Sequence, residues 1–288
     1  MSTENLPSVV KSQSALPDYL QTYVKEHQSS ELADLSKYWV PQRLKTKQAQ
    51  SGDQYKDYHD GDVLLVPEMV LIAHAGEPFW ITPIYQFTDF CKWSPYGMKG
   101  QMKVIAERTS DMNSTLAKRA MSRKEDDWYE ICPESPKARQ GDRQFQYCYC
   151  EHINFVVVLR ANEKFPDHPA HRYLNNPFVI SFHHSGFYEG KQFATLIQNR
   201  RLPWGATQFE LFTKDKSNSQ GTWKGMIVSN PSFESGMSPV VTDEKDFKFY
   251  RSIYEDCKAK DEADEIRVDY EDDTSEDNEP VVDAAGKF

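Results

Sequence analysis

Alternating apolar and polar positions dominate the middle of the chain and predict a protein built mainly from β-strands. Between residues 62 and 96 lie two apolar runs, VLLV and MVLIA, separated at Pro67, and an aromatic alternating run, PFWITPIYQFTDF. HINFVVVLR and PFVISFHH each predict a buried strand. QFELFTKDK and TWKGMIVS alternate on either side of SNSQG, which is typical of a β-hairpin.

Helical spacing is confined to short segments. Residues 17–27, 31–38, 187–200 and 243–257 predict helices, the third preceded by Ser185 and Gly186 where a cap would lie. The polar residues 43–61 predict a loop, and residues 98–145 predict a charged, partly helical excursion from the core. The fold class expected is therefore α+β with β dominant, as a small barrel or sandwich with a few flanking helices.

Charge divides the chain into a neutral body and an acidic end. The chain has 288 residues and a net charge of -10. From Asp261 onward there are 12 acidic and two basic residues, which leaves 32 of each sign in residues 1–260. We expect a flexible N-terminus over 1–15, one domain over 16–258, and a disordered acidic tail over 259–288, because the tail has too few apolar residues to fold.

Several classes of protein are not expected from this sequence. No apolar run approaches the roughly 20 residues that span a bilayer, and the N-terminus does not resemble a secretory signal. The five cysteines are odd in number and unevenly spaced, so a disulfide framework is not predicted. Nucleotide-binding, zinc-protease and serine-hydrolase motifs are absent, and nothing in the sequence pairs Asp89 with His183 and His184 for catalysis. The expectation is a cytoplasmic protein without enzymatic activity.

One group of residues has the types that bind zinc. Cys148, Cys150 and His152 follow Cys132, and together they would supply four thiolate or imidazole ligands. A C-x-C-x-H run on a strand, however, places its three side chains on one face, which suits a tetrahedral ion poorly. Buried free thiols are the favoured interpretation, with zinc as a minor alternative and no cofactor expected.

Aromatic and basic residues alternate in two parts of the chain. Single-stranded nucleic acids stack their bases on exposed aromatic rings while Lys and Arg contact the phosphates. The alternative is that most of these rings belong to the core. The candidate DNA-binding residues are Trp80, Tyr85, Lys92, Trp93, Lys191, Arg200, Arg201, Trp204, Trp223 and Lys224.

The acidic tail has two interpretations. It can simply keep the protein solvated, or it can compete with nucleic acid for a basic groove and bind partner proteins. In the second case the partner-binding end includes Asp283 and the terminal Phe288.

These features resemble a known group of proteins. The acidic C-terminus ending in Phe, behind a β-rich body with aromatics among lysines and arginines, resembles phage-encoded single-stranded DNA-binding proteins with an OB-fold. A second resemblance, to phage proteins of similar size, covers roughly residues 16–255. It rests on LPDYL, PQRLKTKQ, the Gly-Asp before a strand, a cysteine-containing excursion, SFHHSGFYEGKQFATLI and the hairpin ELFTKDKSNSQGTW. Those phage proteins carry more cysteines in the excursion, often as CxxC, than this chain does.

The resemblance implies an OB-like barrel that binds single-stranded DNA without sequence preference in DNA replication, recombination or repair. Replication or recombination proteins would be bound through the tail. The alternative hypothesis is an interaction or inhibitor protein whose acidic tail mimics nucleic acid on a host enzyme. The sequence leaves the oligomeric state open.

Overall fold

The named strands of the described residues form one ten-stranded sheet. The structure, a computed structural model, describes residues 39–49, 51, 53–95, 105–160, 173–183, 186–218, 221–231 and 238–270. The strands are β1 (Arg43–Thr46), β2 (Val63–Val66), β3 (Val70–Ala73), β4 (Phe79–Trp93), β5 (Ile105–Thr109), β6 (Tyr129–Glu130), β7 (Tyr147–Arg160), β8 (Pro177–Phe182), β9 (Phe209–Asn218) and β10 (Gly221–Ser229). The predicted helices over 17–27 and 31–38 lie outside the described residues, as does the N-terminal segment 1–15.

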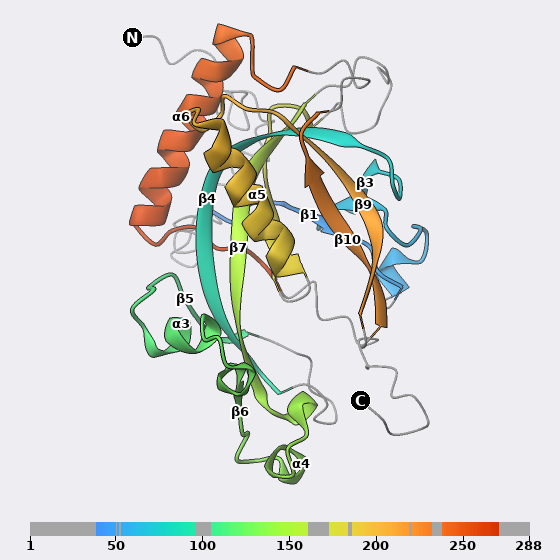
Figure 1. Cartoon of the computed structure of the whole chain (residues 1–288), viewed down its shortest axis with the longest axis vertical. Coiled ribbons are helices and arrows are strands. Elements are labelled where there is room, and N and C mark those ends of the chain that lie inside the picture. The colour runs from blue at the N-terminus through green and yellow to red at the C-terminus, as the bar shows by residue number, and fades with distance from the viewer. Residues whose placement is uncertain are drawn as a thin grey trace, which may run out of the picture.

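The strand order shows how distant parts of the chain meet. The order is β10-β9-β4-β7-β8-β1-β2-β3, with β5 added beside β4 and β6 beside β7. All described pairings between named strands are antiparallel except that of β1 with β8, which is parallel. The long strands β4 and β7 bend along their length (Figure 1), so the sheet is curled and open.

Four α-helices accompany the sheet in the described residues: α3 (Thr115–Ala120), α4 (Pro136–Arg139), α5 (Phe187–Arg200) and α6 (Glu244–Glu262). Short 3-10 turns occur at η2 (Asp53–Tyr55), η3 (Glu125–Trp128) and η4 (Arg143–Phe145). Helix α5 contacts β7, β8 and β10, so it lies inside the curl of the sheet (Figure 1). Helix α6 contacts β4, and its N-cap is Asp243, whose side chain accepts hydrogen bonds from the amides of Lys245 and Asp246.

Alternation along β7 produces the two faces of the sheet. Phe155 and Val157 pack into the core under α5, whereas Val156 and Val158 pack on the opposite side with Tyr250 and the residues after α6. In β4 the same alternation shifts between Pro83 and Tyr85, where the register to β7 slips by one residue. This bulge determines which aromatic side chains of β4 pack on the α5 side of the sheet and which pack on the side of Tyr250.

A glycine allows α5 to approach the sheet. A β-carbon at Gly190 would lie 2.6 Å from the β-carbon of Phe182 on β8, closer than two such atoms can pack. The close approach lets Phe193 and Ile197 enter the core between β7 and β9. Residue 190 is therefore expected to tolerate no larger side chain.

The β-dominant α+β organisation predicted from the sequence is confirmed, together with the hairpin β9–β10 and the helices α5 and α6. Two predictions were wrong. Residues 43–46 form strand β1 rather than a loop, because they pair with β2 and β8. Residues 259–270 do not belong to a disordered tail: α6 continues to Glu262, and Ile266, Val268 and Tyr270 are buried. No helix within the described residues is both long and apolar enough to cross a membrane.

Candidate nucleic-acid interface

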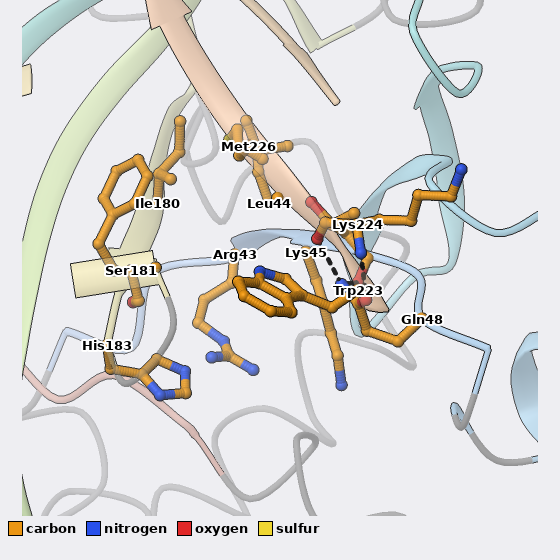
Figure 2. Close-up of a pocket in the computed structure, with 14 residues that line it drawn as sticks. Arg43, Leu44, Lys45, Gln48, Ile180, Ser181, His183, Trp223, Lys224 and Met226 are labelled. Atoms are coloured by element: carbon orange, nitrogen blue, oxygen red, sulfur yellow. Dashed lines mark hydrogen bonds between the residues drawn. The ribbon is translucent and has the colours of Figure 1, made fainter. Parts of the chain in front are cut away.

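A cavity opens where β1 and β8 face β10 across the opening of the curled sheet. Its volume is about 350 Å³. Its floor is apolar, since Leu44, Ile180 and Met226 belong to the core under α5. Figure 2 shows that these three side chains lie on one side of β1, while Arg43, Lys45, His183 and Trp223 lie on the other. The cavity therefore combines an apolar floor with a rim of aromatic and basic side chains.

Side-chain hydrogen bonds hold this opening together. The Gln48 side-chain amide donates to the carbonyl oxygen of Lys224 at 2.8 Å, and the Lys224 backbone amide donates to Gln48 Oε1 at 2.9 Å (Figure 2). The Gln48 side chain thus makes the two hydrogen bonds that a backbone peptide group of a neighbouring strand would make. Nearby, the Thr213 hydroxyl donates to the Gly61 carbonyl and accepts from the Gly76 amide. These bonds join the β1–β3 end of the sheet to the β9–β10 hairpin without a backbone ladder.

The rim carries positive charge. Arg43 and Lys45 alternate with Leu44 along β1, so both cations point to the same side of the strand. Lys45 Nζ donates to the Tyr55 hydroxyl at 3.2 Å, and the Arg43 guanidinium lies 5.6 Å from the centre of the Tyr270 ring. None of the described residues that line the cavity is acidic. The charged side chains among these described lining residues are therefore all cations.

Trp223 supplies the aromatic surface. It stands on β10 opposite Lys216 of β9, and its side chain is half-buried. Lys224 lines the cavity mainly through its backbone, because its ammonium group pairs with Asp215 at 2.7 Å and points away in Figure 2. The half-buried indole beside two cations is the arrangement that single-stranded nucleic-acid sites use.

Stacked rings connect the cavity to a buried polar network. The His183 ring stacks on His152 with 4.4 Å between ring centres, and His152 lies 4.1 Å from the Tyr270 ring. The Tyr270 hydroxyl donates to Asp89 Oδ2 at 2.6 Å. Asp89 also pairs with Arg108 at 2.6 Å, so its buried carboxylate has a matched cation.

Two further polar side chains complete the network. Asn154 donates to Asp89 at 3.2 Å, and its carbonyl oxygen accepts from the Ser181 hydroxyl at 2.7 Å and lies 3.0 Å from the Tyr270 hydroxyl. Burial and the nearby Asp89 carboxylate raise the pKa of Tyr270, so its hydroxyl stays protonated and keeps donating. The hydrogen bonds among Asp89, Asn154 and Tyr270 fix the wall behind Arg43 and His183.

Residues 263–270 form a strap that holds Tyr270 in this network. The Trp39 amide donates to the Glu265 carbonyl, and the Arg267 amide donates to the Trp39 carbonyl, which makes one parallel bridge. Ile266, Val268 and Tyr270 alternate into the core beneath. Tyr270, the last described residue of the strap, therefore lies beside Arg43 at the rim of the cavity.

The structure places two of the predicted tryptophans in the core. Trp80 is 4% exposed and Trp93 is 2% exposed, and the Trp93 indole donates to Cys150 Sγ at 3.0 Å. A ring buried to this extent has no free face for a base. The prediction that these two residues line a binding groove is therefore wrong.

The other predicted residues of β4 lie in separate environments. The half-buried Tyr85 donates to Asp261 and packs edge-on against Tyr254 of α6. Lys92 lies over the rings of Tyr147 and Tyr149 and pairs with glutamates of the excursion. Both side chains are held by partners within the fold.

The predicted cations of α5 do not gather at one place. Gly186, at the start of α5, lines the cavity, and Lys191 lies over the Phe187 ring one turn further on. Arg200 and Arg201 end the helix, which puts them about 20 Å from its first residue at 1.5 Å per residue. Trp204 is half-buried against the core.

Of the ten predicted DNA-binding residues, the structure brings only Trp223 and Lys224 to the cavity. Sequence patterns do not point to Arg43 and Lys45, because the polar residues 43–61 predict a loop, although RLKT alternates charged and uncharged side chains. His183 was noticed in the sequence but had no assigned partner. Asp283 and Phe288 lie outside the described residues.

The four candidate zinc ligands do not form a site in the structure. Cys132 packs against Ala138 and Phe145 in the excursion, whereas Cys150 lies beside His152, with 3.0 Å between Sγ and Nε2. Cys148 faces the same side of β7 as Cys150, as the alternation requires. Buried free thiols therefore describe Cys132 and Cys150 better than metal ligands do.

Comparisons of this chain with protein-family models, with curated proteins and with solved structures found no match.

Proposed function

We propose that the protein binds single-stranded DNA without sequence preference, and that the cavity between β1, β8 and β10 holds one nucleotide of the strand. The observation that carries this proposal is the half-buried Trp223 beside Arg43 and Lys45, on a rim whose described residues include no acid. Aromatic stacking tolerates any base, and the half-buried Lys45 would contact a phosphate, with the positive charge of the buried Arg43 behind it. No catalytic step is part of the proposal.

The size of the cavity supports one nucleotide rather than a longer segment. Its volume of about 350 Å³ is at the lower end of small-ligand sites, which measure roughly 300–1,000 Å³. A longer strand would have to continue along the surface on either side. The network of Asp89, Arg108 and Tyr270 supports the site from behind, because it fixes Arg43 before the ligand arrives.

Several parts of the proposal rest on the sequence resemblance. These are an OB-like role for the curled sheet, a phage origin with action in the host cytoplasm, and a place in DNA replication, recombination or repair. Binding of replication or recombination proteins through Asp283 and Phe288 belongs with them. A cation-rimmed cavity in the body favours this function over the hypothesis of a nucleic-acid mimic, which needs only the acidic tail.

Fluorescence anisotropy with a labelled oligo(dT) strand tests the proposal. Trp223→Ala is expected to weaken binding by about 1–3 kcal/mol, the value of one stacked base. Trp128→Ala is the matched control, since Trp128 is partly exposed on the excursion, where its indole donates to the Ser122 carbonyl. Both variants should unfold at a temperature close to that of the parent.

Two results would contradict the proposal. One is a parent protein that does not bind oligo(dT) at micromolar concentration and low salt. The other is equal affinity in the parent, Trp223→Ala and Trp128→Ala, which would mean that any binding occurs elsewhere on the surface.

A further inference from the structure

Two histidines and one aspartate converge at the end of the β2–β3 hairpin. In this hairpin Val63 pairs with Ala73, so the residues just before β2 and just after β3, Asp62 and His74, lie side by side. A turn in which the Asp62 amide donates to the His59 carbonyl folds His59 back over Asp62. Gly61, with a φ of +96°, provides the left-handed conformation that this turn needs.

The aspartate is fixed by the backbone of both loops. The His59 amide donates to Asp62 Oδ2 at 2.8 Å, and the Ala75 amide donates to Asp62 Oδ1 at 3.0 Å. The Asp62 side chain is only 2% exposed. An ionised carboxylate has about four lone-pair sites, so each oxygen keeps one site for a further partner.

Both imidazoles point the same nitrogen at this carboxylate. His59 Nδ1 lies 3.7 Å from Oδ2, and His74 Nδ1 lies 3.5 Å from Oδ1. These distances exceed the roughly 2.7–3.2 Å of an N–H···O hydrogen bond. They match two ligands of one ion, because atoms bound at about 2.1 Å around a tetrahedral centre lie about 3.4 Å apart.

We propose that His59, Asp62 and His74 bind a divalent transition-metal ion, with Nδ1 of each imidazole and the carboxylate as ligands. The three ligand atoms all lie within 4.8 Å of one another, and no other group of three such residues was found in the described part of the chain. Imidazole and carboxylate ligands suit zinc and its neighbours in the first transition row. This inference is independent of nucleic-acid binding.

The surroundings define what kind of site this is. The side chains of His59 and His74 are 86% and 63% exposed, so water completes the coordination and the ion enters directly from solvent. The backbone bonds to Asp62 orient the carboxylate, as outer-shell contacts do in metal sites. The ion would join the loop before β2 to the loop after β3, beside the Thr213 bonds that hold the sheet opening.

Isothermal titration of the untagged, metal-free full chain with Zn²⁺ tests this site. The parent is expected to bind one ion at this site and to unfold at a higher temperature with Zn²⁺ present. His59→Gln and His74→Gln each remove one ligand, and each should weaken binding at least as much as the loss of an outer-shell partner, about 10–100-fold. Both histidines are exposed, so the variants should fold like the parent.

Asp60→Asn is the matched control. It removes a negative charge next to the site, but Asp60 pairs with Lys47 and is not a ligand, so the affinity should stay within a small factor of the parent. Co²⁺ provides a second readout, because thiolate ligands add a strong near-ultraviolet band that imidazole and carboxylate do not. Parent-like Zn²⁺ affinity in both histidine variants, or a thiolate band that they leave unchanged, would overturn the proposal.

Discussion

Truncation after Tyr270 and truncation after Lys260 are expected to have different consequences. The first removes residues 271–288, which contain seven acidic residues and one basic residue, a net charge of -6. This truncation leaves every residue that the structure describes in place. The second also removes the end of α6 and the strap that buries Ile266, Val268 and Tyr270. The two variants therefore separate the charge of the tail from the packing of the strap.

The cost of losing the strap follows from its burial. Three buried side chains at about 1.5–3 kcal/mol each contribute about 4.5–9 kcal/mol. The hydrogen bond from Tyr270 to the Asp89 carboxylate adds about 1.5–3 kcal/mol. Together these terms approach the whole stability of a typical domain, about 5–15 kcal/mol. The variant ending at Lys260 should be unfolded or nearly so, whereas the variant ending at Tyr270 should match the parent.

Urea denaturation followed by circular dichroism measures this difference. A chain ending at Lys260 with the same midpoint and slope as the full chain would refute the argument, because the strap would then contribute nothing to the fold. Tyr270→Phe in the full chain isolates the hydroxyl and should cost about 1.5–3 kcal/mol. Tyr188→Phe is its control, since Tyr188 is exposed.

The variant ending at Tyr270 also tests the tail. If single-stranded DNA binds at the cavity, the variant should bind oligo(dT) more tightly than the full chain at low salt, because the acidic segment follows Tyr270 in the sequence and the Tyr270 ring lies 5.6 Å from the Arg43 guanidinium. The gain should shrink as salt rises, since screening weakens tail and phosphate contacts alike. Equal affinities at low ionic strength would show that the tail does not compete at this site.

Three further predictions concern single side chains. Lys45→Gln should weaken oligo(dT) binding and lower the slope of log affinity against log salt by about 0.7; Lys137→Gln, on the excursion, should leave the slope unchanged. A hydrogen bond from Tyr149 lowers the pKa of Glu130; the stability that Glu130 gives is therefore present at neutral pH and lost as pH falls through its lowered pKa. Glu130→Gln should thus be less stable than the parent at pH 7 but not in acid, and equal stability at both would contradict this. Burial raises the pKa of the Cys91 thiol to about 12, so iodoacetamide should label Cys91 in urea but not in the folded protein, as mass spectrometry can show.

Local patterns were sufficient for the elements that are long or sharply bounded. The hairpin β9–β10 follows from two alternating runs and a polar turn, and α6 follows from an apolar stripe behind Asp243. Strand β1 could not be found in this way. Its four residues include two cations, and it exists because β2 and β8 flank it from positions distant in the sequence.

The candidate site was harder to predict than the fold, because it depends on which face each side chain takes. The bulge between Pro83 and Tyr85 shifts the alternation of β4, so composition could not show that Trp93 faces the core. Trp223 carries the same kind of signal in the sequence but stands on β10 at the opening of the sheet. Only the pairing of strands distinguishes a buried ring from an accessible one.

The strap shows how average composition can hide a short structural signal. Residues 261–270 contain five acids, which predicts disorder, yet Ile266, Val268 and Tyr270 alternate as a strand would. Their burial places the last described residue against Asp89 and His152, behind the cavity rim. A ligand that moves Arg43 is therefore expected to shift the Tyr270 ring, 5.6 Å from the Arg43 guanidinium, and the acidic segment follows Tyr270 in the sequence. By reciprocity, any partner that pulls on that segment hard enough to loosen Tyr270 should weaken binding in the cavity by the same factor as the ligand weakens the partner.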